Sequence, residues 1–171
     1  QAEWLPQLPH SQSLAFIRAH TTIEPYTSLQ ETLGHRIQPR ETAIRLSYRD
    51  INLPQPFART KYLAPVNLQE TLFAVPVSFN MSVFADEANF ASARFTQAAD
   101  FKWSSFTFPV QFSYAHFQGV ASFFGSLFTQ KADFYRTRFD DVANFDTVTF
   151  EQAGQFMYAD FAQNVSFSGS R

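Results

Sequence analysis

Phenylalanine recurs along most of this chain at a fixed spacing. From Phe79 to Phe167 the gaps between the successive repeated Phe residues alternate between five and six residues without a break. Two positions before each of these Phe residues stands a small residue, as Ala88 does before Phe90. Side chains two apart in an extended strand point to the same side, so the small residue and the Phe share one face. The pattern predicts short strands with inward Phe, repeating every eleven residues.

The same register continues toward the N-terminus. Hydrophobic residues occupy one of the Phe columns there: Leu68, Phe57 and Leu46. Three prolines fall eleven residues apart, at the spare position of each six-residue step: Pro54, Pro65 and Pro76. Proline lacks an N–H and is tolerated at corners rather than inside a strand ladder. The repeat is therefore predicted to begin near Ile44 and to run to residue 171, giving a repeat domain of residues 44–171.

An eleven-residue period is also typical of right-handed coiled coils. At about 100° per residue, however, the small and Phe positions would point to two opposed sides of a helix rather than to one stripe. A strand this short cannot bury its Phe alone, so copies must stack. Stacked copies place each Phe over another at about 4.8 Å. The sequence thus predicts an all-β solenoid.

The repeated units resemble those of a known family. Residues 88–90, 99–101, 132–134 and 143–145 read Ala-Asn-Phe or Ala-Asp-Phe, and they resemble the A-[DN]-[LF] unit of pentapeptide-repeat proteins. The resemblance implies a right-handed quadrilateral β-helix with four units per coil. Because every second unit has six residues here, such a coil would hold about 22 residues. The spacing alone leaves two or three units per turn open.

The first 43 residues break the period. Ser11-Gln12-Ser13 precedes an apolar stretch that is typical of a short helix, and Ser28-Leu29-Gln30-Glu31 resembles a capping box followed by Gly34 as a stop. Residues 1–43 are therefore predicted to form a cap or strap with one or two short helices. Such a cap would cover the open edge of the first coil. The alternative is a partner-binding segment.

The sequence offers little chemistry. It has no Cys, which excludes disulfides, thiol chemistry and thiolate metal sites. The four His residues show no metal-ligand spacing, and His116 takes an outward position between Arg94 and Arg138 in a 22-residue coil. The adjacent carboxylates Asp140 and Asp141 are expected simply to face water. We therefore predict no catalytic, cofactor or metal site and expect that the protein is not an enzyme.

The outward positions carry the candidate binding residues. In 22-residue coils one face would gather the following side chains: Tyr114, Tyr135, Arg136, Met157 and Tyr158. Trp103 and Phe124 would lie on the opposite face. Tyr, Trp, Arg and Met are enriched where protein partners bind. The alternative is that these are scattered surface residues or cross-coil contacts that stabilise the rod.

A rod with regular faces and no site chemistry favours a scaffolding or protein-binding function, acting through its side faces. The family resemblance implies an alternative, a DNA mimic that binds a topoisomerase. Such a mimic needs an extended acidic surface, and Arg94, Arg136 and Arg138 interrupt any acidic belt. The net charge of −2 gives no reason to expect direct binding of nucleic acid.

The C-terminal repeat, residues 165–169, runs to Arg171 without a closing segment. An uncapped coil exposes unpaired backbone groups, and the early coils are basic while the late coils are acidic, so head-to-tail association with itself or with a partner is a second alternative. Further coils beyond the chain, or a fold-back cap, would remove this edge. No apolar run is long enough to span a bilayer. The chain begins at Gln1, which favours a processed, extracytoplasmic protein (secreted, periplasmic or thylakoid-lumenal) over a cytoplasmic one.

Overall fold

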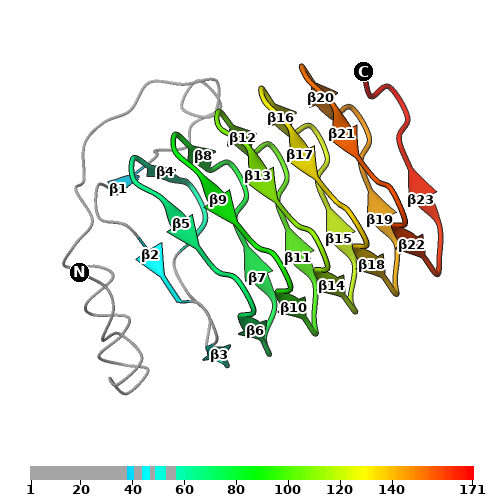
Figure 1. The fold of residues 1–171 in the computed structure, drawn as a ribbon, viewed down its shortest axis with the longest axis horizontal. Helices are drawn as coiled ribbons and strands as arrows, with labels where there is room; N and C mark the ends of the chain where they lie inside the picture. Colours follow the sequence, from blue (N-terminus) through cyan, green and yellow to red (C-terminus); the bar gives the residue numbers. More distant parts are fainter. Residues whose placement is uncertain (1–37, 41–43, 47–48, 53–56) are drawn as a thin grey trace.

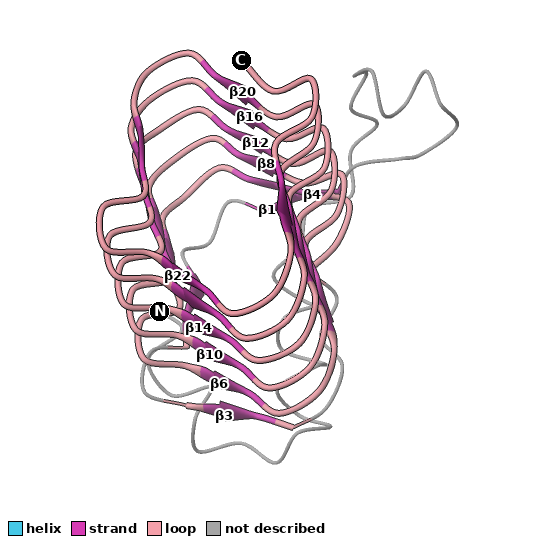
Figure 2. Ribbon diagram, turned by 90° about the vertical axis from the view of Figure 1, so that its right-hand side faces the viewer, coloured by secondary structure: helices cyan, strands magenta, loops and turns pink. Residues whose placement is uncertain are grey.

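The chain winds into a stack of parallel coils. The computed structural model describes residues 38–40, 44–46, 49–52 and 57–171. About five coils of about 22 residues each stack along the long axis (Figures 1 and 2). Every strand pairs in parallel with the strand 22 residues away, as Phe95 does with Phe117. The 22-residue, four-sided coil predicted above is confirmed.

Four sheets form the sides, and we number them as faces 1 to 4 in chain order. Face 1 contains β1 (Gln38–Arg40), β4 (Thr60–Tyr62), β8 (Val83–Phe84), β12 (Ser105–Phe106), β16 (Leu127–Phe128) and β20 (Thr149–Phe150). Face 2 contains β2 (Ile44–Arg45), β5 (Val66–Asn67), β9 (Ala88–Asn89), β13 (Val110–Gln111), β17 (Ala132–Asp133) and β21 (Gly154–Gln155). Face 3 contains β3 (Asp50–Ile51), β6 (Leu72–Phe73), β10 (Arg94–Phe95), β14 (His116–Phe117), β18 (Arg138–Phe139) and β22 (Asp160–Phe161). Face 4 contains β7 (Val77–Ser78), β11 (Ala99–Asp100), β15 (Ala121–Ser122), β19 (Ala143–Asn144) and β23 (Val165–Ser166).

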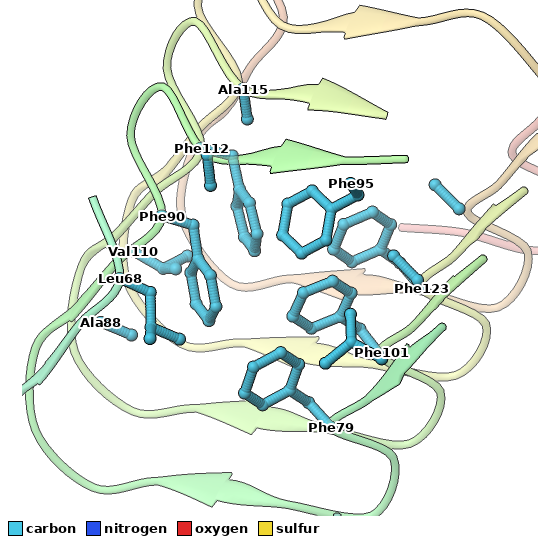
Figure 3. Packing of buried hydrophobic residues seen from close by; sticks show 14 of the residues in the cluster. Leu68, Phe79, Ala88, Phe90, Phe95, Phe101, Val110, Phe112, Ala115 and Phe123 are labelled. Atoms are coloured by element: carbon cyan, nitrogen blue, oxygen red, sulfur yellow. The ribbon is translucent and has the colours of Figure 1, made fainter. Parts of the chain in front are cut away.

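The core consists of stacked phenylalanine rings. Phe123 lies between Phe101 and Phe145, with ring centroids 4.9 Å apart and ring planes within 4° on both sides. Figure 3 shows Phe79, Phe101 and Phe123 following one another up this column. Rings from face 2 meet it edge to face, so that Phe112 and Phe123 lie 5.4 Å apart at 85°. The predicted column of Phe101, Phe123 and Phe145 is confirmed.

Two kinds of corner explain the alternation of five and six residues. After the inward Phe on faces 2 and 4, a two-residue turn follows whose second residue has a positive φ, as at Trp103 (57°). Ser104 N donates to Phe101 O across this turn at 3.2 Å. A positive φ at the third position of a turn is the signature of type II. The other two corners are wider bends, and they hold the extra residue of each six-residue unit.

The polar residue before many of the Phe residues caps this turn. Asn89 Oδ1 accepts from Ala91 N at 2.9 Å, and Asp133 Oδ1 accepts from Tyr135 N at 2.9 Å. Asn and Asp form such bonds to the backbone two residues on, which favours turns. The A-[DN]-F motif is therefore a folding signal: the small residue and the Phe fill the core, and the residue between them fixes the corner.

Buried hydroxyl groups tie successive coils together. Ser126 Oγ donates to Phe101 O at 2.7 Å, and Thr137 Oγ1 donates to Phe112 O at 2.8 Å. Both hydroxyls are buried: the Ser126 column also holds Thr60, Ser82 and Ser104, whereas the Thr137 column also holds Ala93 and Ala115. They reach the carbonyl of the coil before and so add a side-chain bond to the backbone ladder.

One sequence prediction falls outside the described residues. The N-terminal cap and its short helices, residues 1–43, lie almost wholly outside the described residues and stay a prediction. Strand β1 precedes the expected boundary at residue 44 and already pairs with β4 in the 22-residue register. Among the described residues, no helix is long and apolar enough to cross a membrane.

Candidate protein-binding surfaces

One corner of the stack, between faces 2 and 3, gathers the predicted tyrosine residues. We call the set Tyr114, Tyr135, Arg136, Met157 and Tyr158 the tyrosine surface. Tyr114, Arg136 and Tyr158 occupy the same turn position in three successive coils, and Tyr135 and Met157 precede the last two of them. The backbone holds the coils together here, since Tyr114 N donates to Tyr135 O at 2.9 Å and Arg136 N to Met157 O at 3.0 Å.

Arg136 is at the centre of the tyrosine surface. Its guanidinium carbon lies 5.9 Å from the ring centroid of Tyr114, 5.4 Å from that of Tyr135 and 5.6 Å from that of Tyr158. The rings also touch one another edge to face, Tyr135 lying 5.6 Å from Tyr114 and 5.8 Å from Tyr158. The structure therefore brings these residues into one cluster. Tyr114, Met157 and Tyr158 nevertheless keep 53%, 49% and 69% of their surface exposed.

Three residues of the tyrosine surface adopt a backbone conformation that is unfavourable for residues with a side chain. Tyr114, Arg136 and Tyr158 have φ values of 58°, 52° and 58°, a conformation that favours glycine. The left-handed conformation costs roughly 1–2 kcal/mol for a residue with a Cβ. Exposed cation–π contacts contribute about 0.5–1 kcal/mol each and offset part of that cost. The cluster thus fixes three large side chains in place on a turn whose left-handed conformation would cost glycine less free energy.

Trp103 and Phe124 lie at the diagonally opposite corner, between faces 4 and 1. We call this pair the tryptophan patch. The two rings meet edge to face with centroids 5.2 Å apart, and Trp103 is 45% exposed. Gly125 allows this arrangement, because a Cβ at that position would collide with the Trp103 ring at Cε3. The patch and the tyrosine surface are therefore separate surfaces.

The repeats of this chain match a known family. Residues 104–149 match the family profile of pentapeptide repeats, in nine copies. Residues 104–149 are therefore pentapeptide repeats. Among curated proteins and solved structures, no match was found. The family resemblance drawn from the Ala-Asn-Phe and Ala-Asp-Phe units is confirmed, and the solenoid fits a structural or protein-binding rod.

Face 3 of the solenoid carries a charged cluster that the sequence analysis did not predict. His116 pairs with Arg94 and Arg138 in the register expected for the coil. Asp140, expected only to face water, lies between two of these neighbours: its Oδ2 is 2.6 Å from His116 Nε2, and its Oδ1 accepts from Arg138 Nε at 2.6 Å. The 22-residue register together with the outward position of Arg138 is the signal that could have found this pairing.

The charged cluster has an electrostatic consequence. The hydrogen bond from Arg138, followed by that from His116, holds the pKa of Asp140 below its ordinary value. A carboxyl whose pKa falls on folding stabilises the folded state at neutral pH, and this contribution is lost in acid as the pH drops through the lowered pKa. Within the described part of the chain, no group of three His, Cys, Asp or Glu side chains could hold a metal ion. The cluster therefore links the coil of His116 to the coil of Asp140.

Proposed function

We propose that this pentapeptide-repeat solenoid is a non-catalytic rod that binds a protein partner through its tyrosine surface. The observation that carries the proposal is the exposed cluster of Arg136 within 6 Å of three tyrosine ring centroids. Tyr and Arg are among the residues that most often dominate the binding energy of protein interfaces.

The rigidity of the rod supports this function. The parallel ladder on either side of the turn fixes the backbone, and the ring and guanidinium contacts limit the rotamers of Tyr135 and Arg136. Binding therefore removes little side-chain entropy at this surface. Immobilising a mobile side chain on binding generally costs about 0.5–1.5 kcal/mol. A pre-organised aromatic cluster is thus suited to act as the centre of an interface.

The charges around the tyrosine surface argue against mimicry of DNA. Arg94 and Arg136 are exposed, and Arg138 is exposed beside Asp140. These three guanidinium groups lie on face 3 and at its corner, where a DNA mimic would need an uninterrupted acidic belt. The basic side chains favour a protein partner that offers aromatic, apolar and some acidic groups at this corner.

The test replaces Tyr135 and Tyr158 together by Ser. Binding of the native partner, captured from native extract and quantified by titration, should weaken by about 2 kcal/mol or more, roughly thirtyfold in Kd. The matched control is Phe108→Ser, which also removes an exposed aromatic ring, 43% exposed, at a different corner. Both variants should keep the circular dichroism spectrum of the parent chain. Equal capture by the double variant and the parent would count against the tyrosine surface.

A further inference from the structure

The outward positions of face 4 and of the two bends that flank it form a short ordered array. In one column Lys102, Phe124 and Asp146 follow one another on three successive coils. In the next column Asp100, Ser122 and Asn144 do the same. At the bend that precedes the face, the order is Ala98, Val120 and Val142, of which the two valines are 42% and 41% exposed. Each column is thus centred on the coil that contains β15, the middle strand of face 4 in Figure 1.

We infer that face 4 pairs with face 4 of a second copy of this chain, the two rods antiparallel. The twofold axis lies in the interface, perpendicular to the rods, and passes through the coil of β15. Such an axis maps each column onto itself with its order reversed. Lys102 of each copy then faces Asp146 of the other, and Phe124 faces its own equivalent on the axis.

The remaining positions of face 4 also match under this operation. Asp100 faces Asn144 of the second copy, Val120 faces its own equivalent, and Ala98 faces Val142. No like charges meet, and two equivalent Lys–Asp pairs lie on either side of an apolar centre. Electrostatic complementarity of this kind fixes the register of an interface and disfavours wrong partners.

Only one register of the antiparallel pair places Lys102 opposite Asp146 without setting like charges against one another. An axis through β11 would set Lys102 against its own equivalent and Asp100 against its own, and an axis through β19 would set Asp146 against itself. Like charges placed opposite one another across an interface are costly. An axis midway between β11 and β15 would bury Lys102 against Phe124. The order of the column therefore selects β15.

The charged groups are available for the pairing. Lys102 is exposed, and among the described residues its ammonium group has no partner. Asp146 uses Oδ1 for its own chain, accepting from Ser166 Oγ and from Ser168 N at 2.8 Å. Its Oδ2 takes no part in these bonds. The tryptophan patch lies along the same corner, so Trp103 would be covered in part, opposite Thr147 of the second copy.

The pairing leaves the tyrosine surface open. That surface lies at the corner between faces 2 and 3, diagonally across the rod from the corner between faces 4 and 1. A dimer through face 4 would therefore present two tyrosine surfaces on its outer sides. Two binding sites on one dimer raise the avidity for a partner that itself presents repeated binding sites.

A charge-exchange experiment tests the dimer. Sedimentation equilibrium of the full chain is measured over a concentration series for the parent and for Lys102→Glu, Asp146→Lys and the control Lys131→Glu. Either face-4 change alone sets two like-charge pairs across the axis, so dimerisation should weaken at least tenfold. The control removes an exposed Lys at the bend between faces 1 and 2 and should leave the dimer unchanged.

Mixing the two face-4 variants tests most specifically whether Lys102 faces Asp146 of the second copy. A mixed dimer of one Lys102→Glu chain and one Asp146→Lys chain restores both attractive pairs, so an equimolar mixture should dimerise with nearly the parent affinity. Because Asp146→Lys removes bonds within its own chain, its fold is checked by circular dichroism. If that variant misfolds, the contrast between Lys102→Glu and Lys131→Glu decides by itself.

Cysteine substitution locates the axis independently, since the chain has no Cys of its own. Val120→Cys lies on the axis and should be joined to its equivalent by a short bis-maleimide reagent. Val142→Cys is equally exposed in the same column but lies two coil steps, about 9.6 Å, from its equivalent along the rods, and should react poorly. A parent chain that stays monomeric throughout would overturn the inference. So would a dimer that Lys102→Glu leaves intact, equal cross-linking of the two Cys variants, or head-to-tail growth insensitive to face 4.

Discussion

Replacing Phe123 by Ala is expected to lower the free energy of unfolding by about 3–5 kcal/mol. Phe123 is fully buried, stacks at 4.9 Å on Phe101 and Phe145, and meets Phe112 edge to face. The substitution leaves a cavity in the middle of the column, where the hydrogen-bonded coils on either side resist collapse. Urea unfolding followed by circular dichroism measures the change, with the slope of the transition checked for constancy.

The control for Phe123→Ala is Phe108→Ala. Phe108 is 43% exposed at a bend, so its loss should cost less than about 1 kcal/mol. A similar loss at both positions would mean that the Phe columns do not carry the core. A predominantly helical spectrum of the parent chain would exclude the solenoid outright.

Removing a whole coil is expected to keep the fold, whereas removing one unit should destroy it. Deletion of residues 99–120 takes out 22 residues and joins Ala98 to Ala121, which leaves every later strand on its own face. In a stack where each coil contacts only its neighbours, such a deletion removes about one coil's share of the stability. The shortened chain should therefore unfold cooperatively at a lower urea concentration.

Deletion of residues 99–103 removes a single five-residue unit. In the coil that follows the deletion, six-residue bends would then lie over five-residue turns of the coil before it, so the parallel ladder could not close at the corners of that junction. The expected result is loss of the cooperative transition, measured by the same urea titration. If this chain unfolded as cooperatively as the one without residues 99–120, the strict 22-residue register would be wrong.

The core of the solenoid was predictable because its positions are dictated by geometry alone. An inward column in a stack of coils accepts only residues that fill the same space in each copy, so Phe101, Phe123 and Phe145 appear in the sequence as a fixed period. The same period identified the small residues and located the outward positions. The number of units per coil came from the family resemblance, because the spacing of five and six left two or three units per turn open.

Surface contacts were less predictable because they depend on rotamers and on the register between coils. The sequence placed Tyr135, Arg136 and Tyr158 on one side but gave no reason to expect Arg136 within reach of three rings. Asp140 was assigned to solvent, although the register brings its carboxylate between His116 and Arg138. The positive φ of Tyr114 was likewise not predictable, because a residue other than Gly does not indicate in the sequence that it adopts this turn conformation.

The most direct test of the proposed function is site-specific photo-cross-linking with p-benzoylphenylalanine. The reagent residue replaces Tyr158 in one chain and Phe108 in another, both exposed aromatic positions at different corners of the rod. Irradiation in native extract should join the partner to the chain substituted at position 158 and not to the chain substituted at position 108. Cross-linking from position 108 alone, or equally from both positions, would contradict binding through the tyrosine surface.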